Sequence, residues 1–268
     1  MGRRLLQSLP APARGVMPLV RVRRTLLSLL TLTALRAAPA FAQKPGWSAT
    51  VDVNASTLFG ASSQTLASFA AAAKHAGTAF SGDASVRFRY GESEDAEGVK
   101  FVSARGWALA ASVDGVPEGR VSPFVLVAAE QSLEKRLARR TAGGAGIKWV
   151  LSKSEAGVSS LSGAVLGERT LPLSDSLVDA TNLVRWSWRL KAEHQIERLK
   201  LSHVTYYGPE LRAPSQYTIT TTSMASFAIN SAIALTTTVT DNYDNQARVR
   251  GARSNSDGSF LFGIRATF

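Results

Sequence analysis

Basic side chains lie an even number of residues apart in two segments of this 268-residue chain. Arg87 and Arg89 form the first set, and Arg185, Arg189 and Lys191 form the second. Residues i and i+2 of a β-strand share a face, so each set would present a row of cations that attracts anions or acidic solutes. The candidate functional residues are therefore Arg87, Arg89, Arg185, Arg189, Lys191 and, near the chain end, Arg265.

An enzyme would have to draw its base from three histidines, His75, His194 and His203. Ser202 precedes His203, but neighbouring residues of a strand point to opposite faces and cannot form a nucleophile–base pair. Another serine could partner His203, which leaves a lipid hydrolase as an alternative. We predict that the protein is not an enzyme and has no catalytic residues.

The sequence gives little support for a metal or cofactor. It has no cysteine and no His-Glu-x-x-His motif, and its histidines are widely spaced. Acidic residues cluster between Glu92 and Glu97 and could bind a divalent cation weakly, although a solvated loop is the simpler interpretation. No helical pattern follows the glycines of segment 143–146, so a tight strand crossing is favoured over a phosphate site. We expect no metal and no cofactor.

The first 42 residues have the pattern of a secretory signal peptide. Arg21, Arg23 and Arg24 precede an apolar run over residues 25–35, and Ala40 and Ala42 complete an Ala-x-Ala cleavage site. The run is too short to cross a bilayer as a helix, which needs about 20 residues. We expect cleavage after Ala42, a mature domain over residues 43–268, and a start at either Met1 or Met17.

The strong positive charge belongs mostly to this N-terminal segment. The whole chain has 31 basic and 20 acidic residues, and residues 1–42 hold seven arginines and no acid. The mature charge is therefore 31 − 7 − 20 = +4 instead of +11. This removes the compositional argument for a nucleic-acid partner. The absence of cysteine excludes a disulfide framework.

Alternation of apolar and polar residues predicts an all-β mature domain. Turn signals divide it into about 12 strands. Residues 70–73 are all alanine and could instead belong to a short helix, which would reduce the count to eleven. The expected strands are 47–59, 63–79, 82–91, 98–113, 120–131, 136–152, 155–169, 182–195, 198–208, 215–229, 232–243 and 257–268.

The connections between these segments alternate in length, except that the Asp114–Gly119 turn is somewhat long and the connections after strands 47–59 and 120–131 are short for the outer side. Short connections are expected at Ser81–Gly82, Lys153–Ser154, Ile196–Glu197 and Asn230–Ser231, and the longest at residues 92–98, 170–181, 208–214 and 244–256. This is typical of a membrane β-barrel and is not expected of a soluble sandwich. Charges facing lipid would cost about 2–4 kcal/mol at the midplane, so the basic rows should face inward. Trp47, Tyr90, Trp186 and Trp188 should then face lipid. Arg105 and Trp107 fall on the same side of one strand, so the sequence does not decide which face of that strand points inward.

The last nine residues alternate and end on an aromatic residue, as closing strands of outer-membrane barrels do. The expected partner of this strand is the first strand, from Trp47. Leu261 and Ala266 depart from the usual pattern of such strands. The residues assigned to an insertion signal are Phe260, Phe262, Gly263, Ile264 and Phe268.

The chain resembles the salt-induced outer-membrane proteins (YdiY-like), a family of unknown function. The likeness is carried by the order and spacing of Glu134–Ile147, Tyr207–Leu211, Thr240–Asp244 and the closing strand, and it covers nearly all of the mature chain. The resemblance implies an outer-membrane barrel and supplies no catalytic residues.

We therefore predict a monomeric antiparallel transmembrane β-barrel in the outer membrane, in contact with lipid and with the barrel assembly machinery. The sequence leaves two alternatives for the interior of the barrel. The cations could leave a narrow pore that favours anions, or they could pair with Asp52, Glu168 and Glu193 and fill a barrel with a structural role. The alternatives are a lipid-modifying barrel enzyme and a soluble periplasmic β-sheet protein that binds a ligand.

Overall fold

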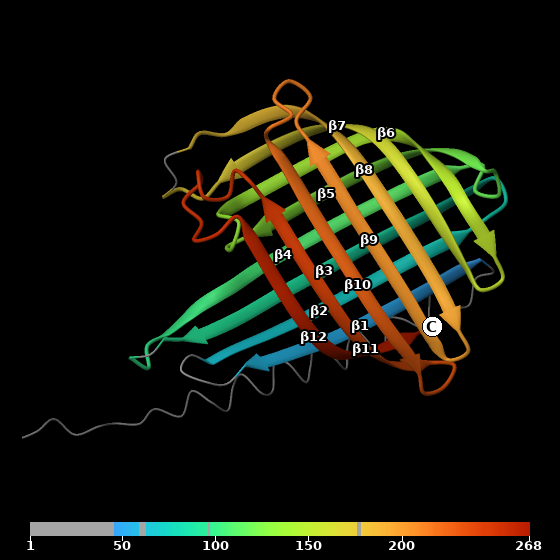
Figure 1. Cartoon of the computed structure of the whole chain (residues 1–268), viewed down its shortest axis with the longest axis horizontal. Helices are drawn as coiled ribbons and strands as arrows, with labels where there is room; N and C mark the ends of the chain where they lie inside the picture. Colours follow the sequence, from blue (N-terminus) through green and yellow to red (C-terminus); the bar gives the residue numbers. More distant parts are fainter. Residues whose placement is uncertain (1–45, 59–62, 96, 176–177) are drawn as a thin grey trace, which may run out of the picture. The chain divides into compact units, whose positions relative to one another are not determined.

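The computed structural model describes residues 46–58, 63–95, 97–175 and 178–268. The expected signal peptide and its cleavage site after Ala42 lie outside the described residues. Within them are twelve strands (Figure 1). These are β1 (Trp47–Leu58), β2 (Ser63–Ala76), β3 (Phe80–Glu94), β4 (Lys100–Gly115), β5 (Val121–Ser132), β6 (Leu137–Ser154), β7 (Gly157–Pro172), β8 (Thr181–Ile196), β9 (Leu199–Pro209), β10 (Tyr217–Ala228), β11 (Ile233–Asp244) and β12 (Ser256–Thr267).

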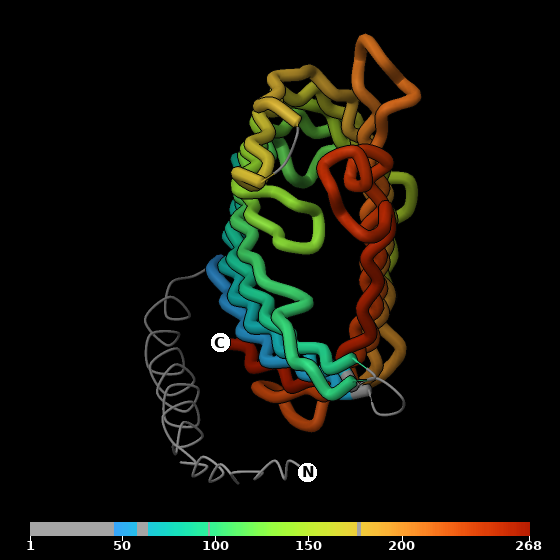
Figure 2. Tube along the Cα trace, turned by 90° about the vertical axis from the view of Figure 1, so that its left-hand side faces the viewer, coloured from blue at the N-terminus to red at the C-terminus, as the bar shows by residue number. Residues whose placement is uncertain are grey.

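Every strand pairs antiparallel with its neighbours in sequence, and β1 pairs with β12 to close the barrel. At this seam Asp52 lies opposite Arg265, and Figure 2 shows the C-terminal strand beside the first one. The predicted twelve-stranded antiparallel barrel is confirmed, including the pairing of its first and last strands. No helix in the described part of the chain is long and apolar enough to cross a membrane.

The strand boundaries agree with the sequence prediction to within three residues. The helical alternative for residues 70–73 is wrong, because they lie inside β2 and pair with β1 and β3. Neither Ser81–Gly82 nor Lys153–Ser154 is a turn, since β3 already begins at Phe80 and β6 continues to Ser154. The connection expected at residues 92–98 is also shorter than predicted, because β3 continues to Glu94 after a register shift at Gly91.

The two ends of the barrel differ. We call one the turn end; it holds the connections at residues 77–79, 116–120, 155–156, 197–198 and 229–232. We call the other the loop end; it holds the connection at residues 133–136, the longer ones at 210–216 and 245–255, and the connection between β7 and β8. The predicted alternation of connection lengths is thus present on most hairpins.

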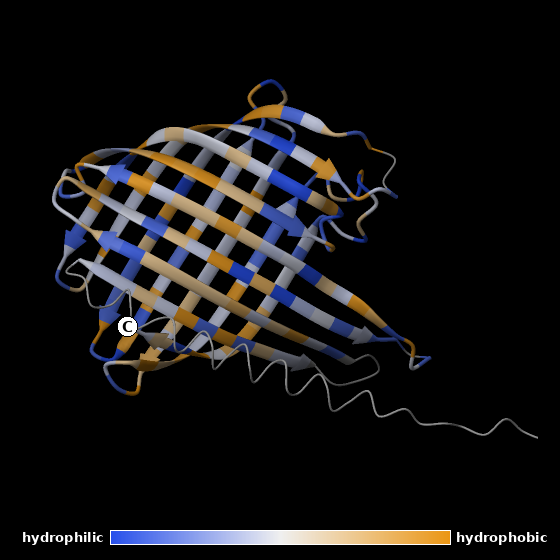
Figure 3. Ribbon diagram, turned by 180° about the vertical axis from the view of Figure 1, so that it is seen from behind, coloured by the Kyte–Doolittle hydropathy of each residue, from blue (hydrophilic) through white to orange (hydrophobic). Residues whose placement is uncertain are grey.

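The outer face is mostly apolar. Trp186 and Trp188 are 41 and 40 % exposed, and Phe260, Phe262 and Ile264 are at least half exposed. Polar residues alternate with them along the strands and face inward, which gives the banded pattern of Figure 3. Exposed apolar side chains on this scale are stable in lipid and unfavourable in water. The chain is an outer-membrane-type β-barrel, which disfavours the soluble alternative.

Arg105 and Trp107 share the outward face of β4. Arg105 is near the loop end, and β4 pairs with β5 only from Gly106 onward. The first residues of β4 therefore extend past the end of β5. Arg105 is paired with Tyr90 of β3 alone, at the edge of the wall near the loop end, whereas Trp107 is paired on both sides, with Phe88 of β3 and Gln131 of β5.

Glycines allow close approach of backbones at two places in the wall. At Gly144 and Gly146 of β6, a Cβ atom would overlap the carbonyl oxygens of Val165 and Gly163 on β7. The tight strand contact expected for segment 143–146 is therefore present. Inside the barrel, Leu66 of β2, Ala104 of β4 and Leu261 of β12 form a small buried apolar cluster. Leu261, a departure from the usual closing-strand pattern, packs inward in this cluster.

Candidate functional site in the barrel lumen

The six basic residues chosen from the sequence all lie on strand faces that point into the barrel. Four of them form ion pairs: Arg89 with Asp257 (3.2 Å), Arg185 with Glu168 (3.1 Å), Lys191 with Glu193 (2.9 Å) and Arg265 with Asp52 (2.7 Å). Three of these pairs use the acids that the sequence offered as neutralising partners. The lumen is therefore partly filled by ion pairs.

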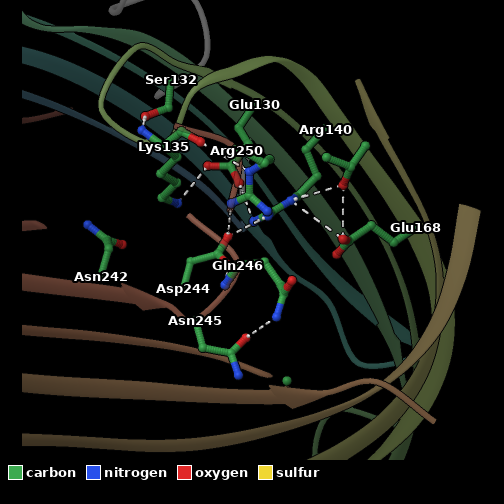
Figure 4. Close-up of polar contacts among 12 residues, drawn as sticks. Glu130, Ser132, Lys135, Arg140, Glu168, Asn242, Asp244, Asn245, Gln246 and Arg250 are labelled. Carbon is green, nitrogen blue, oxygen red and sulfur yellow. Dashed lines mark hydrogen bonds and ion pairs between the residues drawn. The ribbon is translucent and has the colours of Figure 1, made fainter. Parts of the chain in front are cut away.

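Arg140 of β6 is the centre of a larger group of charges near the loop end (Figure 4). Its guanidinium lies 3.0 Å from Glu130 Oε1, 2.8 Å from Asp244 Oδ2 and 3.5 Å from Glu168 Oε1. Because β6 and β11 are not neighbouring strands, the Arg140–Asp244 pair crosses the lumen. An ion pair inside the barrel therefore connects the wall around β6 with the wall around β11.

Arg250 attaches the 245–255 loop to this group. Its Nη2 atom lies 2.6 Å from Asp244 Oδ2, and its Nε donates a hydrogen bond to the carbonyl oxygen of Lys135 at 3.2 Å. Lys135 in turn pairs with Glu130 at 3.0 Å. Burial lowers the pKa of the Arg250 guanidinium, while Asp244 opposes that effect. We call Glu130, Lys135, Arg140, Glu168, Asp244 and Arg250 the outer ion-pair network.

The 133–136 connection makes further charged contacts at the same end. Arg89 lies 3.6 Å from Glu134 and 3.2 Å from Asp257. Arg136 lies 2.6 Å from Asp175, and its hydrogen bond lowers the pKa of that carboxyl. These contacts link the 133–136 connection to β3 and to the connection after β7.

Cavities occupy the lumen on both sides of the network. An inner cavity of about 700 Å³ reaches from the turn end to Arg87, and a middle cavity of about 400 Å³ begins at the same residue. Arg140 lines both the middle cavity and an outer one of about 280 Å³. Lys135 and Asp244 line the middle cavity and a second outer one of about 430 Å³. The network therefore lies between the outer cavities and the rest of the lumen.

Two cations in the middle of the lumen have no acidic partner. Arg189 donates to Ser162 Oγ at 3.3 Å and lies over the Phe124 ring, 5.7 Å from its centroid. Within the described residues, neither Arg87 nor Arg189 has a carboxylate within 4.0 Å. The path between the inner and middle cavities is consequently positive, which favours anions.

A hydrogen-bonded histidine and serine lie on the outer wall. His203 Nδ1 is 2.8 Å from Ser223 Oγ on the next strand, and its Nε2 is 2.9 Å from Thr205 Oγ1. Ser202 lines the inner cavity, so the prediction that it does not pair with His203 is correct. The partnership with Ser223 depends on the register of β9 against β10, which single-strand alternation does not provide.

The residues of the expected insertion signal divide between the two faces of β12. Phe260, Phe262 and Ile264 point outward, whereas Gly263 points inward. Phe268 exchanges backbone hydrogen bonds with Ala49 across the seam. The segment thus combines an apolar outer face with backbone closure of the barrel.

The acidic segment after Tyr90 forms local contacts. Tyr90 donates to Glu92 at 2.6 Å, Lys100 lies 3.6 Å from Glu94, and Asp95 accepts from the backbone N–H of Val99 at 2.8 Å. Among the described residues, no three histidine, cysteine or acidic side chains gather at a distance suited to one metal ion.

Sequence reasoning missed several charged residues of the lumen, among them Lys74, Glu130, Lys135, Arg140, Lys200, Asp244 and Arg250. Arg140 and Asp244 lie in segments that carried the family resemblance. The sequence therefore drew attention to both residues, but it did not show that their side chains contact each other. Arg250 lies in a loop that has no alternation to interpret. The inward phase of β2 would have identified Lys74, but the run of alanines there hides it.

Comparison with known proteins gives the following findings. A family model described as "Protein of unknown function, DUF481" matches residues 55–268. No curated protein matches the sequence. The translocator domain of autotransporter NalP from Neisseria meningitidis is 7 % identical with a TM-score of 0.44, covering 91 % of this chain and 97 % of that one. The NanC porin is 9 % identical with a TM-score of 0.48, covering 80 and 98 %. The KdgM porin in complex with disordered oligogalacturonate is 10 % identical with a TM-score of 0.42, covering 82 and 99 %.

Proposed function

The chain belongs to the family described as "Protein of unknown function, DUF481", which assigns no activity, and we propose from its lumen that it is a narrow pore for anions. The observation that supports this most strongly is the position of Arg87. It lines both the inner and the middle cavity and has no carboxylate within 4.0 Å among the described residues. A cation at the junction of two water-accessible cavities lowers the energy of an anion there and raises that of a cation.

The apolar outer face supports residence in the outer membrane as a monomer surrounded by lipid. In this proposal the signal peptide is removed after Ala42, and the terminal strand with Phe268 is the signal for the barrel assembly machinery. The order and spacing of the segments that resemble the salt-induced (YdiY-like) proteins support membership of that group within the family.

Reversing the charge of Arg87 should invert the ion preference. We expect refolded wild-type barrel in a planar bilayer to favour chloride over potassium in a KCl gradient. The Arg87→Glu barrel should have a reversal potential of opposite sign, because the change removes a cation from the narrow path and adds an anion. The measurement is the reversal potential at low and high salt, with a smaller difference expected at high salt.

Arg169→Glu provides the matched control. Arg169 lies next to inward-facing Glu168 on β7 and so points away from the lumen, where a charge reversal should leave the reversal potential unchanged. Current that is absent from both the wild-type and an Asp244→Asn barrel would contradict a pore. A structural role in the envelope would then be the better conclusion.

A second candidate function, hydrolysis of a lipid ester, is favoured by the contact between His203 and Ser223. The 2.8 Å distance would let His203 Nδ1 accept the Ser223 hydroxyl proton as that oxygen attacks an ester carbonyl. The pair opens into a mostly apolar outer pocket of about 360 Å³. It ranks second because the surrounding backbone of β9, β10 and β11 is paired in ladders, which leaves no obvious donors for an oxyanion.

Release of fatty acid from phospholipid vesicles tests this candidate. If the site is catalytic, His203→Ala and Ser223→Ala should each reduce release by about 100-fold or more, because each removes one half of the pair. Ser202→Ala, on the lumen side of the same strand, should have no effect. Release that survives His203→Ala would eliminate the enzyme candidate.

A further inference from the structure

The inner cavity has a charge distribution that the pore alone does not require. Its volume of about 700 Å³ is within the range of small-ligand sites. It extends to the turn end, where residues 197–198 and 230–232 contribute to its lining. Its basic side chains come from five different parts of the barrel: Lys74 of β2, Arg87 of β3, Arg198 of the β8/β9 turn, Lys200 of β9 and Arg265 of β12.

Most of the negative charge in this cavity is already paired. Asp52 accepts two hydrogen bonds from Arg265, at 2.7 and 2.8 Å. Glu193 lies 2.9 Å from Lys191 and 3.2 Å from Lys200. The remaining acid of the lining is Glu197, at the turn. The lining therefore keeps an excess of positive charge.

Three lysines surround the single carboxylate of Glu193. Lys191 and Lys200 contact it from β8 and β9, and Lys74 lies within electrostatic range of all three groups. In the strand order, β2 and β8 are on opposite sides of the barrel, so Lys74 faces the other two lysines across the lumen. One carboxylate balances one of these three lysines, which leaves an excess of two basic groups in this centre.

A second cationic centre lies deeper, where Arg87 lines the cavity without a carboxylate within 4.0 Å among the described residues. The two centres are joined by hydroxyl-bearing and amide side chains: Ser48, Thr50, Ser85, Ser202, Ser226 and Asn230. Such groups donate hydrogen bonds to anion oxygens and keep the cavity wet. Two cationic centres in one polar cavity suit a ligand with more than one anionic group.

We propose that this inner cavity is a binding site for a soluble multivalent oxyanion of the phosphate type, entering from the turn end. Lysine ammonium groups bind phosphate as point charges, and Arg87 adds a planar group that can contact two oxygens. The proposal deepens the proposed function by naming the class of solute. Binding itself does not require the barrel to conduct.

Isothermal titration of refolded barrel with sodium tripolyphosphate at low salt tests the site. Lys74→Glu should weaken binding by about tenfold or more, since a cation of the lysine centre becomes an anion. Glu193→Gln should strengthen binding severalfold, because it removes the internal carboxylate that occupies the same centre. Arg212→Glu, in the exposed connection after β9, should leave the affinity unchanged.

Opposite effects of Lys74→Glu and Glu193→Gln separate a specific site from general loss of structure. Heat-modifiable migration in gels should show that all three variants fold. Equal affinity of the wild-type and Lys74→Glu barrels, or no heat of binding from wild type, would overturn the site. Binding without any conductance would keep the site and reject the pore, whereas anion-favouring current without binding would keep the pore and reject the site.

Discussion

An Asp244→Asn barrel should lose about 3–5 kcal/mol of unfolding free energy and should conduct more than the wild type. Asp244 holds two guanidinium groups, Arg140 at 2.8 Å and Arg250 at 2.6 Å, and its side chain is only 4 % exposed. Asparagine keeps the shape and removes the negative charge. Two buried cations are then left close together with one fewer carboxylate to separate them.

The same change should release the 245–255 loop. Arg250 connects this loop to β11 and, through the carbonyl of Lys135, to the 133–136 connection. Loss of this carboxylate removes the 2.6 Å ion pair between the loop and β11. Single-channel conductance should therefore rise severalfold, because the network lies between the outer cavities and the middle one.

Urea unfolding followed by tryptophan fluorescence measures the first effect, and planar-bilayer recording measures the second. Glu118→Gln is the matched control, because Glu118 pairs with Lys153 at 3.3 Å with both side chains at least 65 % exposed. Such surface pairs contribute about 0–1 kcal/mol. A midpoint shift for Asp244→Asn no larger than that of Glu118→Gln, together with unchanged conductance, would rule out a role for the network in closing the lumen.

The fold could be predicted from the sequence because each strand of a membrane barrel is indicated by its own residue pattern, without knowledge of its neighbours. Each strand must place apolar residues in lipid and polar residues in the lumen, so alternation gives both the strand and its face. Trp186 and Trp188 against Arg185 and Arg189 are sufficient to orient β8. Boundaries were less exact where a turn residue such as Gly82 continues a strand.

Contacts across the lumen were harder to predict, because they depend on register and curvature. Arg265 and Asp52 are directly opposed on paired strands, so their ion pair follows once the seam is assumed. Arg140 and Asp244 lie on strands that are not paired, and their distance depends on the shape of the whole barrel. His203 and Ser223 required the register of two strands, with Ser223 lying directly opposite His203.

The lumen is thus divided into an outer part held by ion pairs and an inner part with excess positive charge. Around Asp244 and Glu130 each carboxylate contacts two cations, which favours rigidity over conduction. In the inner cavity that Arg87 lines, Asp52 and Glu193 already form ion pairs with other basic residues. For the proposed pore, this asymmetry predicts that an anion enters more easily from the turn end and that the outer ion-pair network is the main barrier.

Replacement of Gly263 by valine should prevent formation of the closed barrel. Gly263 lies opposite Asn54 on β1 and Thr236 on β11. A Cβ atom there would overlap the Asn54 side-chain oxygen and the carbonyl oxygen of Val53. Asn54 uses the space above Gly263 to accept a hydrogen bond from Thr236 at 3.2 Å, so the valine would also displace this contact.

The expected effect is large because β1 and β12 are paired over only a few residues, so the loss of any backbone hydrogen bond there weakens closure of the barrel. The register between β1 and β12 runs only from Thr50–Thr267 to Ala55–Phe262, shorter than any other strand pairing among the described residues. Gly263 lies next to one end of that span. Overpacking of a well-filled interior costs about 1–3 kcal/mol, and a shifted Val53 carbonyl would also weaken the ladder that closes the barrel.

Refolding of purified Gly263→Val protein into detergent micelles, followed by heat-modifiable migration in gels, isolates closure from recognition by an assembly machinery. Gly258→Val is the matched control on the same strand, since a Cβ there would have only the Thr240 carbonyl oxygen nearby, at 3.9 Å. We expect the control to fold and the Gly263 variant to remain unfolded. The further change Asn54→Ala should not rescue Gly263→Val, because the Val53 carbonyl is backbone and cannot be removed. A folded double variant would mean that the side chain of Asn54, and not the backbone of the seam, requires glycine at this position.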